Sequence, residues 1–160
     1  MNFVSILMSS ESDIEIMKNC TATFEKFNVK FELMVTSKHK SLEETKQNIK
    51  DAEENGAVAF IVAAGIETHL SGAVAAITTK PVIGVPMEGE EMNAMLSTVQ
   101  MPLGMPVGTV ALGNSGAVNV AYFAMQILAL SNKELAIKLK EDRIVQSKKV
   151  ESDSFEIEVI

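Results

Sequence analysis

Two histidines, His39 and His69, are the side chains of this sequence best suited to proton transfer. Histidine titrates near neutral pH without perturbation, so each is a candidate general acid or base. His39 lies in the run Ser37-Lys38-His39-Lys40, where a positive charge on either side disfavours protonation of its ring. Lys40 could pair with a phosphate as a point charge. A solvated basic loop is the competing interpretation of the same residues.

A second polar run, Ser9-Ser10-Glu11-Ser12-Asp13, follows the first apolar stretch of the chain. The hydroxyls of Ser10 and Ser12, together with helix N-terminal amides, would suit an anion, and Asp13 would suit ribose hydroxyls. Plain helix capping is the alternative, because Ser12-x-x-Glu15 has the form of a capping box.

A third run, Gly65-Ile66-Glu67-Thr68-His69-Leu70-Ser71-Gly72, contains the second histidine. Its glycines allow a ligand to approach the backbone closely. The alternative is a structural, hydrogen-bonded His69 beside a solvated Glu67. Gly113-Asn114-Ser115-Gly116 is a further turn suited to anions, although such turns are common connectors.

Strands and helices alternate along the chain and must position these runs. Five apolar stretches predict strands at Phe3–Met8, Val29–Thr36, Ala57–Ala63, Pro81–Val85 and Val107–Leu112. Apolar strands joined by helices indicate a three-layer α/β fold with a parallel sheet of about five strands, flavodoxin-like or Rossmann-like. Ligands of such folds bind outside the carboxyl ends of the strands, which is where the three polar runs fall.

Helices are predicted between the strands and after the last one. Their expected spans are 14–27, 41–55, 72–79, 92–100, 117–130 and 131 to about 148, with capping boxes at Ser41-x-x-Glu44 and Ser131-x-x-Glu134. The tail Glu151–Ile160 alternates polar and apolar residues and could add a strand or clamp a neighbour. We expect a single domain over residues 1–160, with a core at 1–130 and a C-terminal helix and tail at 131–160.

Composition excludes several classes of protein. The net charge of -7 over 160 residues lacks the electrostatic footprint of a nucleic-acid-binding protein. The single cysteine, Cys20, excludes an internal disulfide and a cysteine metal site, and its apolar neighbours predict an inert buried thiol. With two histidines in separate runs, we expect no metal and no organic cofactor.

The stretch Met92–Asn132 has no charged residue. Its longest plausible helix, Ala117–Leu130, is too short to span a membrane, so we expect burial in protein and no membrane partner. That helix is apolar on nearly all sides, so it has no polar face to expose to water. A neighbouring subunit would best cover the face that does not pack on its own sheet. No signal peptide is evident, which predicts a cytoplasmic location.

Taken in order, these runs resemble the PurE family, the mutases and carboxylases of aminoimidazole ribonucleotide in purine synthesis. The resemblance covers roughly residues 3–130 and rests on six motifs. Family Met-Gly-Ser-x-Ser-Asp resembles Met8–Asp13, Ser-Ala-His-Arg resembles Ser37–Lys40, Ala-His-Leu-Pro-Gly resembles Thr68–Gly72, Pro-Val-Ile-Gly-Val-Pro equals Pro81–Pro86, Ser-Ile-Val-Gln-Met-Pro-x-Gly-x-Pro-Val resembles Ser97–Val107, and Gly-Asn-Ala-Gly-Ala-x-Asn resembles Gly113–Asn119.

The resemblance implies a role for each run. The phosphate would be held by Ser10, Ser12, Ser37 and Lys40, and the ribose by Asp13. His39 would be the general acid/base, and His69 a second catalytic residue better placed to bind than to move a proton. The carboxylate or carbon dioxide pocket would be lined by Gly65, Ile66, Glu67, His69 and Leu70. The family also implies an octamer with sites between subunits and a closed, mostly dry pocket.

The departures from the family fall mostly on the base and carboxylate side. Lys40 replaces an arginine and its planar fork. Gly65-Ile66-Glu67 replaces the family's glycine pair and following alanine, and the loop at 87–92 is shorter than the family's. Gly65-Ile66-Glu67 resembles the Gly-Met-Glu of LarB-type carboxylases, whose nucleophilic cysteine has no counterpart here.

Three functions therefore stand at the level of sequence. Overall similarity favours a mutase that moves carboxylate on aminoimidazole ribonucleotide. Glu67 and the short 87–92 loop favour a paralogous carboxylase or decarboxylase of another ribonucleotide. A non-catalytic nucleotide-binding module is the third, and the presence of both His39 and His69 argues against it. The sequence is compatible with more than one base, and with carbon dioxide or an N-carboxylated nucleotide as donor.

Overall fold

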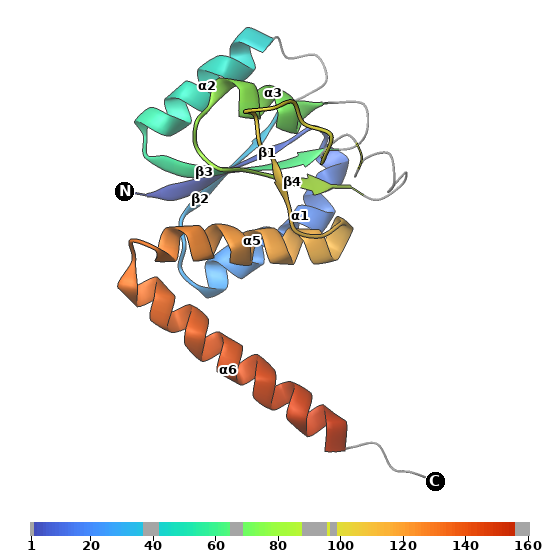
Figure 1. Cartoon of the computed structure of the whole chain (residues 1–160), viewed down its shortest axis with the longest axis vertical. Helices are drawn as coiled ribbons and strands as arrows, with labels where there is room; N and C mark the ends of the chain where they lie inside the picture. The colour runs from blue at the N-terminus through green and yellow to red at the C-terminus, as the bar shows by residue number, and fades with distance from the viewer. Residues whose placement is uncertain (1, 37–41, 65–68, 88–95, 97–98, 156–160) are drawn as a thin grey trace. The chain divides into compact units, whose positions relative to one another are not determined.

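A parallel sheet of five strands lies at the centre of the fold, in the order β2-β1-β3-β4-β5 (Figure 1). The structure, a computed structural model, describes residues 2–36, 42–64, 69–87, 96 and 99–155. The strands are β1 (Phe3–Met8), β2 (Phe31–Val35), β3 (Ala57–Ala64), β4 (Val82–Pro86) and β5 (Gly108–Thr109). Their pairings are parallel, and the order is the flavodoxin-like one. The predicted α/β fold is confirmed.

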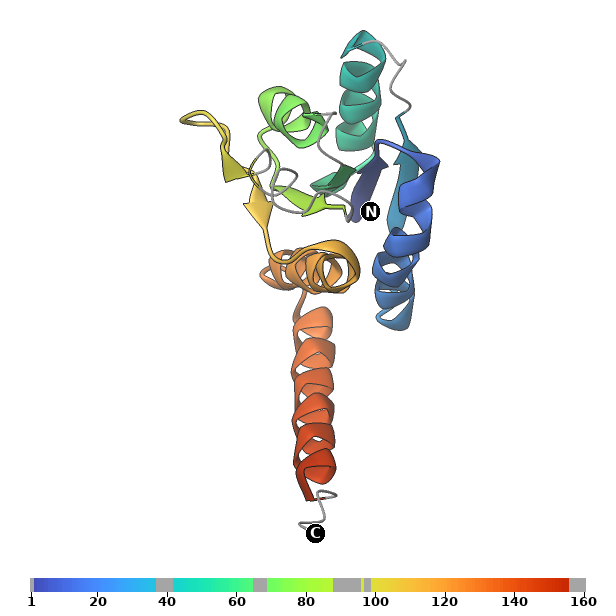
Figure 2. The same ribbon diagram turned by 90° about the vertical axis from the view of Figure 1, so that its right-hand side faces the viewer.

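Helices connect the strands and follow the last of them. Their bounds are η1 (Glu11–Asp13), α1 (Ile14–Lys26), α2 (Leu42–Glu54), α3 (Leu70–Ile77), α5 (Gly113–Ala129) and α6 (Lys133–Phe155). The chain divides into two compact units, Met1–Ala124 and Met125–Ile160, and the prediction of a single domain stays a prediction. Within the first unit, α2 and α3 cover one face of the sheet, while α1 and the first part of α5 cover the other (Figures 1 and 2).

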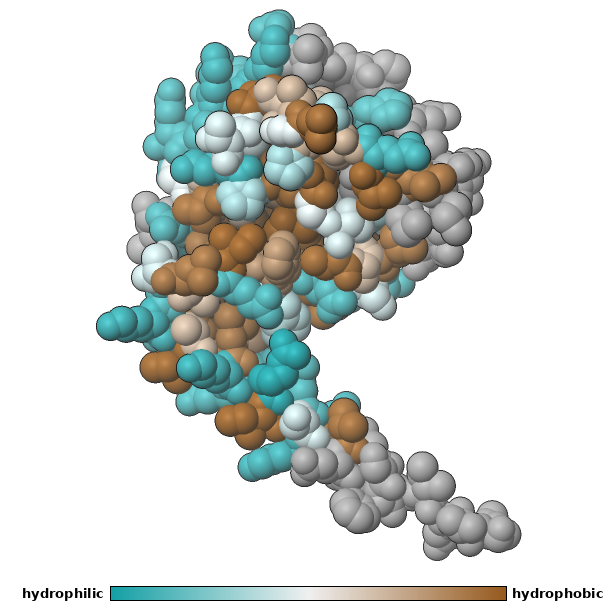
Figure 3. Space-filling view, viewed as in Figure 1, coloured by the Kyte–Doolittle hydropathy of each residue, from teal (hydrophilic) through white to brown (hydrophobic). Residues whose placement is uncertain are grey.

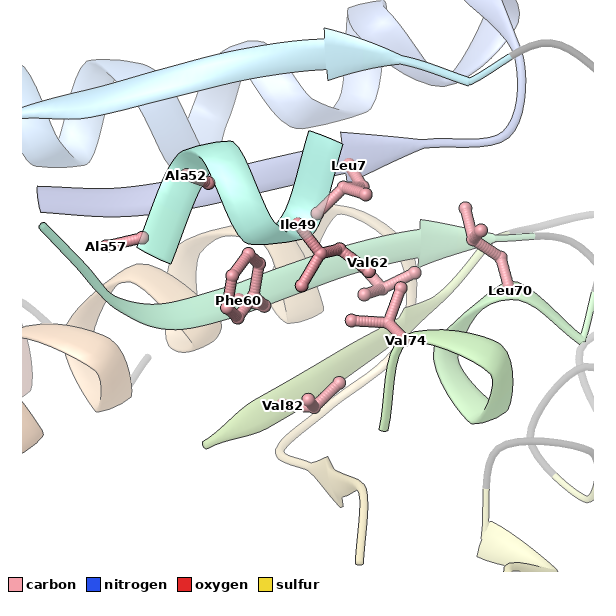
Figure 4. Close-up of a cluster of buried hydrophobic side chains, with 9 residues drawn as sticks. All are labelled: Leu7, Ile49, Ala52, Ala57, Phe60, Val62, Leu70, Val74 and Val82. Atoms are coloured by element: carbon pink, nitrogen blue, oxygen red, sulfur yellow. The ribbon is translucent and has the colours of Figure 1, made fainter. Parts of the chain in front are cut away.

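The core under α2 and α3 explains why the strands are apolar throughout. Phe60 and Val62 of β3 point toward Ile49 of α2 and Val74 of α3, and none of them is more than marginally exposed (Figure 4). Removing each such side chain from water stabilises the fold by about 1.5–3 kcal/mol. A strand covered on both faces cannot alternate polar and apolar residues, and β4 is buried along its whole length.

Aromatic contacts hold the opposite face of the sheet. Phe24 of α1 stacks on Phe31 of β2 with ring centroids 5.8 Å apart. Phe27 meets Tyr122 of α5 edge to face at 5.7 Å. Cys20 of α1 is also fully buried, and desolvation by burial raises the pKa of its thiol to about 12. The predicted burial of this thiol is confirmed, and a thiol with that pKa yields almost no thiolate.

The start of α5 corrects two predicted boundaries. The strand predicted at 107–112 is only Gly108–Thr109, and the turn predicted at 113–116 is the first turn of α5. The backbone N–H of Gly116 donates to the carbonyl of Leu112 at 2.9 Å, which closes that turn. Glycine is needed at position 116 because the helix packs closely against Ala111, and not because the chain turns there. A Cβ at this position would lie 2.6 Å from the carbonyl oxygen of Ala111.

Two predicted capping boxes are also wrong. Ser10, and not Ser12, caps the first helical turn, because its Oγ accepts the backbone N–H of Ser12 at 3.2 Å. At α6 the N–H of Leu135 donates to Asn132 Oδ1 at 3.1 Å, while the Ser131 hydroxyl donates back to the carbonyl of Leu128. Asparagine competes with serine for this position, and the residue nearer the first helical turn caps it.

The remaining differences concern helix lengths. α3 starts at Leu70, before the predicted 72, and α6 continues to Phe155, so that part of the tail is helical and not a strand. Of the helix predicted at 92–100, Leu96 and Val99 are described and helical, and Ser41 of the capping box at α2 lies outside the described residues. In the described part of the chain, no helix has the length and apolar composition to cross a membrane.

Candidate active site

The end of β1 is tied to both neighbouring strands where the predicted polar runs begin. The N–H of Thr36, just after β2, donates to the carbonyl of Met8 at 2.8 Å. The N–H of Ser9 donates to the carbonyl of Ala63 in β3 at 3.1 Å. The segments that leave β1, β2 and β3 therefore start side by side at one edge of the sheet. This is also the point where the strand order reverses, the place where α/β folds bind ligands.

The serine turn after β1 offers a hydroxyl to a ligand. Ser10 Oγ accepts both the backbone N–H of Ser12, at 3.2 Å, and the Ser12 hydroxyl, at 2.8 Å. With its acceptor sites used in this way, the Ser10 hydroxyl proton remains to be donated outward. Ser12 is exposed and Ser10 half-buried, so the pair borders solvent. Such a turn at the start of a helix suits a phosphate oxygen.

Asp13 is a buried carboxylate beside the serine turn. The Ser9 hydroxyl donates to its Oδ2 at 3.2 Å. Burial raises the pKa of the Asp13 carboxyl, and the hydrogen bonds from the Ser9 side chain and the Ser10 backbone oppose that rise. An acidic side chain kept where its charged form is costly is typical of a functional site.

We expect Asp13→Asn to raise the thermal stability of the ligand-free protein at pH 7. The folded-state pKa of Asp13 lies above its unfolded value, so ionisation above that pKa costs folding free energy. Asparagine removes this cost while keeping an acceptor for Ser9. The gain should shrink as the pH falls through the folded-state pKa and vanish below the unfolded value. Melting curves of both proteins from pH 3 to pH 8 measure it, and an equal difference at every pH would contradict it.

His69 takes an unusual backbone conformation. It precedes α3 with φ 41° and ψ 22°, in the left-handed region, and its side chain makes no capping hydrogen bond. Asn28 is the other described residue of this kind, but it follows α1 as an ordinary helix terminator. A strained, exposed histidine at the edge where ligands bind is a candidate functional residue. Leu70, next to it, is buried in the core cluster of Figure 4.

Six other predicted site residues lie outside the described part of the chain, namely Ser37, His39, Lys40, Gly65, Ile66 and Glu67. Ser37 directly follows Thr36 and Gly65 directly follows Ala64, the end of β3. Thr36 and Ala64, the described residues that precede them, lie at the edge of the sheet where Ser9–Asp13 begins.

An open groove lies between α1 and the first turns of α5. It has a volume of about 590 Å³ and is lined by Asn19, Asn114, Ser115, Val118 and Asn119. Asn19 Nδ2 donates to Asn114 Oδ1 at 3.0 Å across it. Four of the lining residues belong to the Gly113–Asn119 motif, so this motif borders a concave surface.

Metal binding finds no support in the described residues. Among them, no three His, Cys, Asp or Glu side chains are arranged to hold an ion. The absence of a metal or organic cofactor stays a prediction.

Known proteins resemble this chain over most of its length. A model of the family described as AIR carboxylase matches residues 3–149. The chain belongs to this family. The predicted resemblance to the PurE family is thereby confirmed.

Three curated relatives of this chain carry the name N5-carboxyaminoimidazole ribonucleotide mutase. The relative from Saccharolobus solfataricus is 42% identical over 141 residues, 86% of this chain and 88% of its own length. The relative from Bacillus subtilis is 43% identical, with 88% of each chain covered. The relative from Escherichia coli K12 is 41% identical over 92% of this chain and 89% of its own. Treponema denticola PurE, at 24% identity, superposes with a TM-score of 0.88 over 99% of this chain and all of its own, which supports the fold alone.

Proposed function

We propose that this chain interconverts N5-carboxyaminoimidazole ribonucleotide and carboxyaminoimidazole ribonucleotide in de novo purine synthesis. The observation that carries the proposal is identity above 40% to several curated mutases over at least 86% of the chain. The turn after β1 supports it, because it joins serine hydroxyls and a buried carboxylate at the ligand-binding edge. Phosphorylated substrates of this kind stay inside cells, in line with the predicted cytoplasmic location.

Each side of the substrate has its own set of residues in this proposal. Ser10, Ser12, Ser37 and Lys40 hold the phosphate, and Asp13 accepts hydrogen bonds from the ribose. On the base side, Gly65, Ile66, Leu70 and His69 border the carboxylate. The hydrogen-bonded pair of Ser10 and Ser12 supports the phosphate assignment, and the buried carboxyl of Asp13 supports the ribose assignment.

The reaction needs one proton transfer and no external reactant. The N–C bond of the substrate carbamate breaks, which releases carbon dioxide and returns the electron pair to the nitrogen. The ring carbon then attacks carbon dioxide, and the proton displaced from that carbon passes through His39 to the exocyclic nitrogen. His39 therefore ends the cycle in its starting state. Carbon dioxide must be held until it reacts, so exclusion of water from the pocket favours this reaction.

Glu67 provides the test that separates a mutase from a paralog. We expect the purified wild type to turn over N5-carboxyaminoimidazole ribonucleotide. A carboxylate facing the substrate carboxylate would repel it, so in a mutase Glu67 must point away from the ligand. Glu67→Ala should therefore change kcat/KM by less than about twofold. The measurement is the rate of formation of carboxyaminoimidazole ribonucleotide. Robust wild-type activity with a silent Glu67→Ala excludes the paralog. An inactive wild type would overturn the proposed function.

We further propose that the protein is a homo-oligomer, consistent with an octamer. Apolar (brown) atoms lie on the surface drawn in Figure 3. In the described part of the first unit, the large exposed apolar side chains are Leu33, Leu96, Val99, Leu103, Met105 and Phe123. Leu103 is fully exposed, in a turn that is closed by a hydrogen bond from the Met105 N–H to the Pro102 carbonyl. The segment that contains this turn projects from the sheet (Figure 2). A subunit contact would remove it from water.

We expect Leu103→Asp to reduce the native mass while leaving the far-ultraviolet circular dichroism spectrum unchanged. A charge at a fully exposed position does not disturb the subunit, but it opposes burial between subunits. Light scattering at micromolar concentration measures the mass, and Asn55→Asp, which adds the same charge at an exposed polar position, should keep the wild-type mass. A monomeric wild type would refute the oligomer, and an unchanged mass for Leu103→Asp would refute the role of this turn.

A further inference from the structure

Ser9 differs from the other serines of the turn after β1, because it is buried and faces Asp13. It is 7% exposed, and its backbone N–H is fixed on the carbonyl of Ala63 in β3. Its hydroxyl donates to Asp13 Oδ2 at 3.2 Å. The family motif has glycine at this position, so the donor belongs to this chain and not to the general pattern.

Asp13 does not use its carboxylate to build the helix that it precedes. It is the N-cap residue of α1, yet its side chain makes no capping hydrogen bond. Instead the carboxylate accepts the Ser9 hydroxyl and the Ser10 backbone N–H. A carboxylate offers about four acceptor positions, so these two donors orient it and leave acceptors for a ligand.

We propose that Ser9 is a positioning residue that holds the Asp13 carboxylate in the orientation that accepts ribose hydroxyls. The inference rests on the proposed function, in which Asp13 reads the ribose. A buried carboxylate without this donor would rotate about its side-chain torsions or draw in water, and either change costs affinity for the sugar. Ser9 itself does not touch the ligand and acts only through Asp13.

Ser5, in the strand β1 that precedes Ser9, provides a matched control. It is fully buried, and its hydroxyl has no hydrogen-bond partner in the described structure. Ser5→Ala therefore removes a buried serine hydroxyl from β1 without touching Asp13. Any general effect of replacing a buried serine by alanine at this end of the chain should appear in both variants.

Calorimetric titration with ribose 5-phosphate tests the proposal without depending on turnover. We expect Ser9→Ala to weaken binding about tenfold, the loss typical of one hydrogen bond to a charged group. Ser5→Ala should bind as the wild type does, and Ser9→Thr, which keeps the hydroxyl, should recover most of the lost affinity. Thermal melts of the four proteins establish that each is folded.

A double-mutant cycle separates positioning from general stabilisation. In an Asp13→Ala background, Ser9→Ala should cause no further loss of affinity, because the carboxylate through which Ser9 acts is absent. Equal losses in both backgrounds, or wild-type affinity in Ser9→Ala, would overturn the proposal, as would a wild type that does not bind ribose 5-phosphate. A wild type that binds the sugar phosphate but turns over no carboxylated nucleotide would overturn the proposed function and leave the role of Ser9 standing.

Discussion

His39→Asn is expected to lower turnover of N5-carboxyaminoimidazole ribonucleotide by roughly 10²–10⁴-fold, the usual contribution of a positioned acid or base. Its affinity for the ribonucleotide should change little, because asparagine keeps hydrogen-bonding groups and cannot titrate. The proton on the ring carbon must reach the exocyclic nitrogen, and an unperturbed histidine is the group best matched to that transfer near neutral pH.

Single-turnover rates and nucleotide titrations separate the two effects. The matched variant is His69→Asn, the same change at the other histidine of the chain. If His69 mainly binds the carboxylate, its loss should raise KM more than it lowers kcat. A His39→Asn protein with a rate within about threefold of the wild type would remove His39 from the proton path, since an acid or base contributes far more.

The central sheet could be predicted from sequence because its burial leaves a plain pattern. The strand predicted at Phe3–Met8 has those bounds in the structure, and α2 ends before Gly56, which takes φ 103°. Strands covered on both faces must be apolar throughout, and a left-handed turn after a helix favours glycine. These local requirements hold whatever the rest of the chain does.

Boundaries set by tertiary contacts could not be predicted in the same way. The choice between Ser131 and Asn132 as the cap of α6 depends on where the first helical turn closes. The left-handed backbone of His69 has no signature in its neighbours, since glycine or asparagine is the usual residue there. In both cases the outcome depends on how the segment packs in the fold, which the local sequence does not specify.

The candidate site shows the same division between local and tertiary information. Ser10, Ser12 and Asp13 could be picked out because polar residues follow an apolar strand at the ligand-binding edge. Ser9 is not identified from the sequence as a partner of Asp13. The visible signal is that Ser9 stands where the family motif has glycine, four residues before the aspartate. Its role depends on the 3₁₀ turn Glu11–Asp13, which brings residues 9 and 13 together.

Gly116→Ala is expected to destabilise the protein by about 3 kcal/mol, at the upper end of the usual cost of overpacking. Helix propensity alone would favour alanine over glycine by about 1 kcal/mol, so the two effects oppose each other. The clash decides the sign, because the new Cβ would lie 2.6 Å from the carbonyl oxygen of Ala111 and 3.1 Å from Val85 Cγ1. A backbone carbonyl cannot turn aside as the end of a flexible side chain can.

Chemical denaturation of Gly116→Ala and of Ser115→Ala measures the two effects separately. Ser115 is exposed in the same turn of α5, so its replacement reports helix propensity without a clash and should change stability by less than about 0.5 kcal/mol. Because α5 starts at the carboxyl edge of the sheet, a shift of its first turn should also alter the groove between Asn19 and Asn114. A Gly116→Ala protein as stable as the wild type would mean that Ala111 and Gly116 do not approach closely in solution, and that residues 113–116 form the loose connection suggested by sequence.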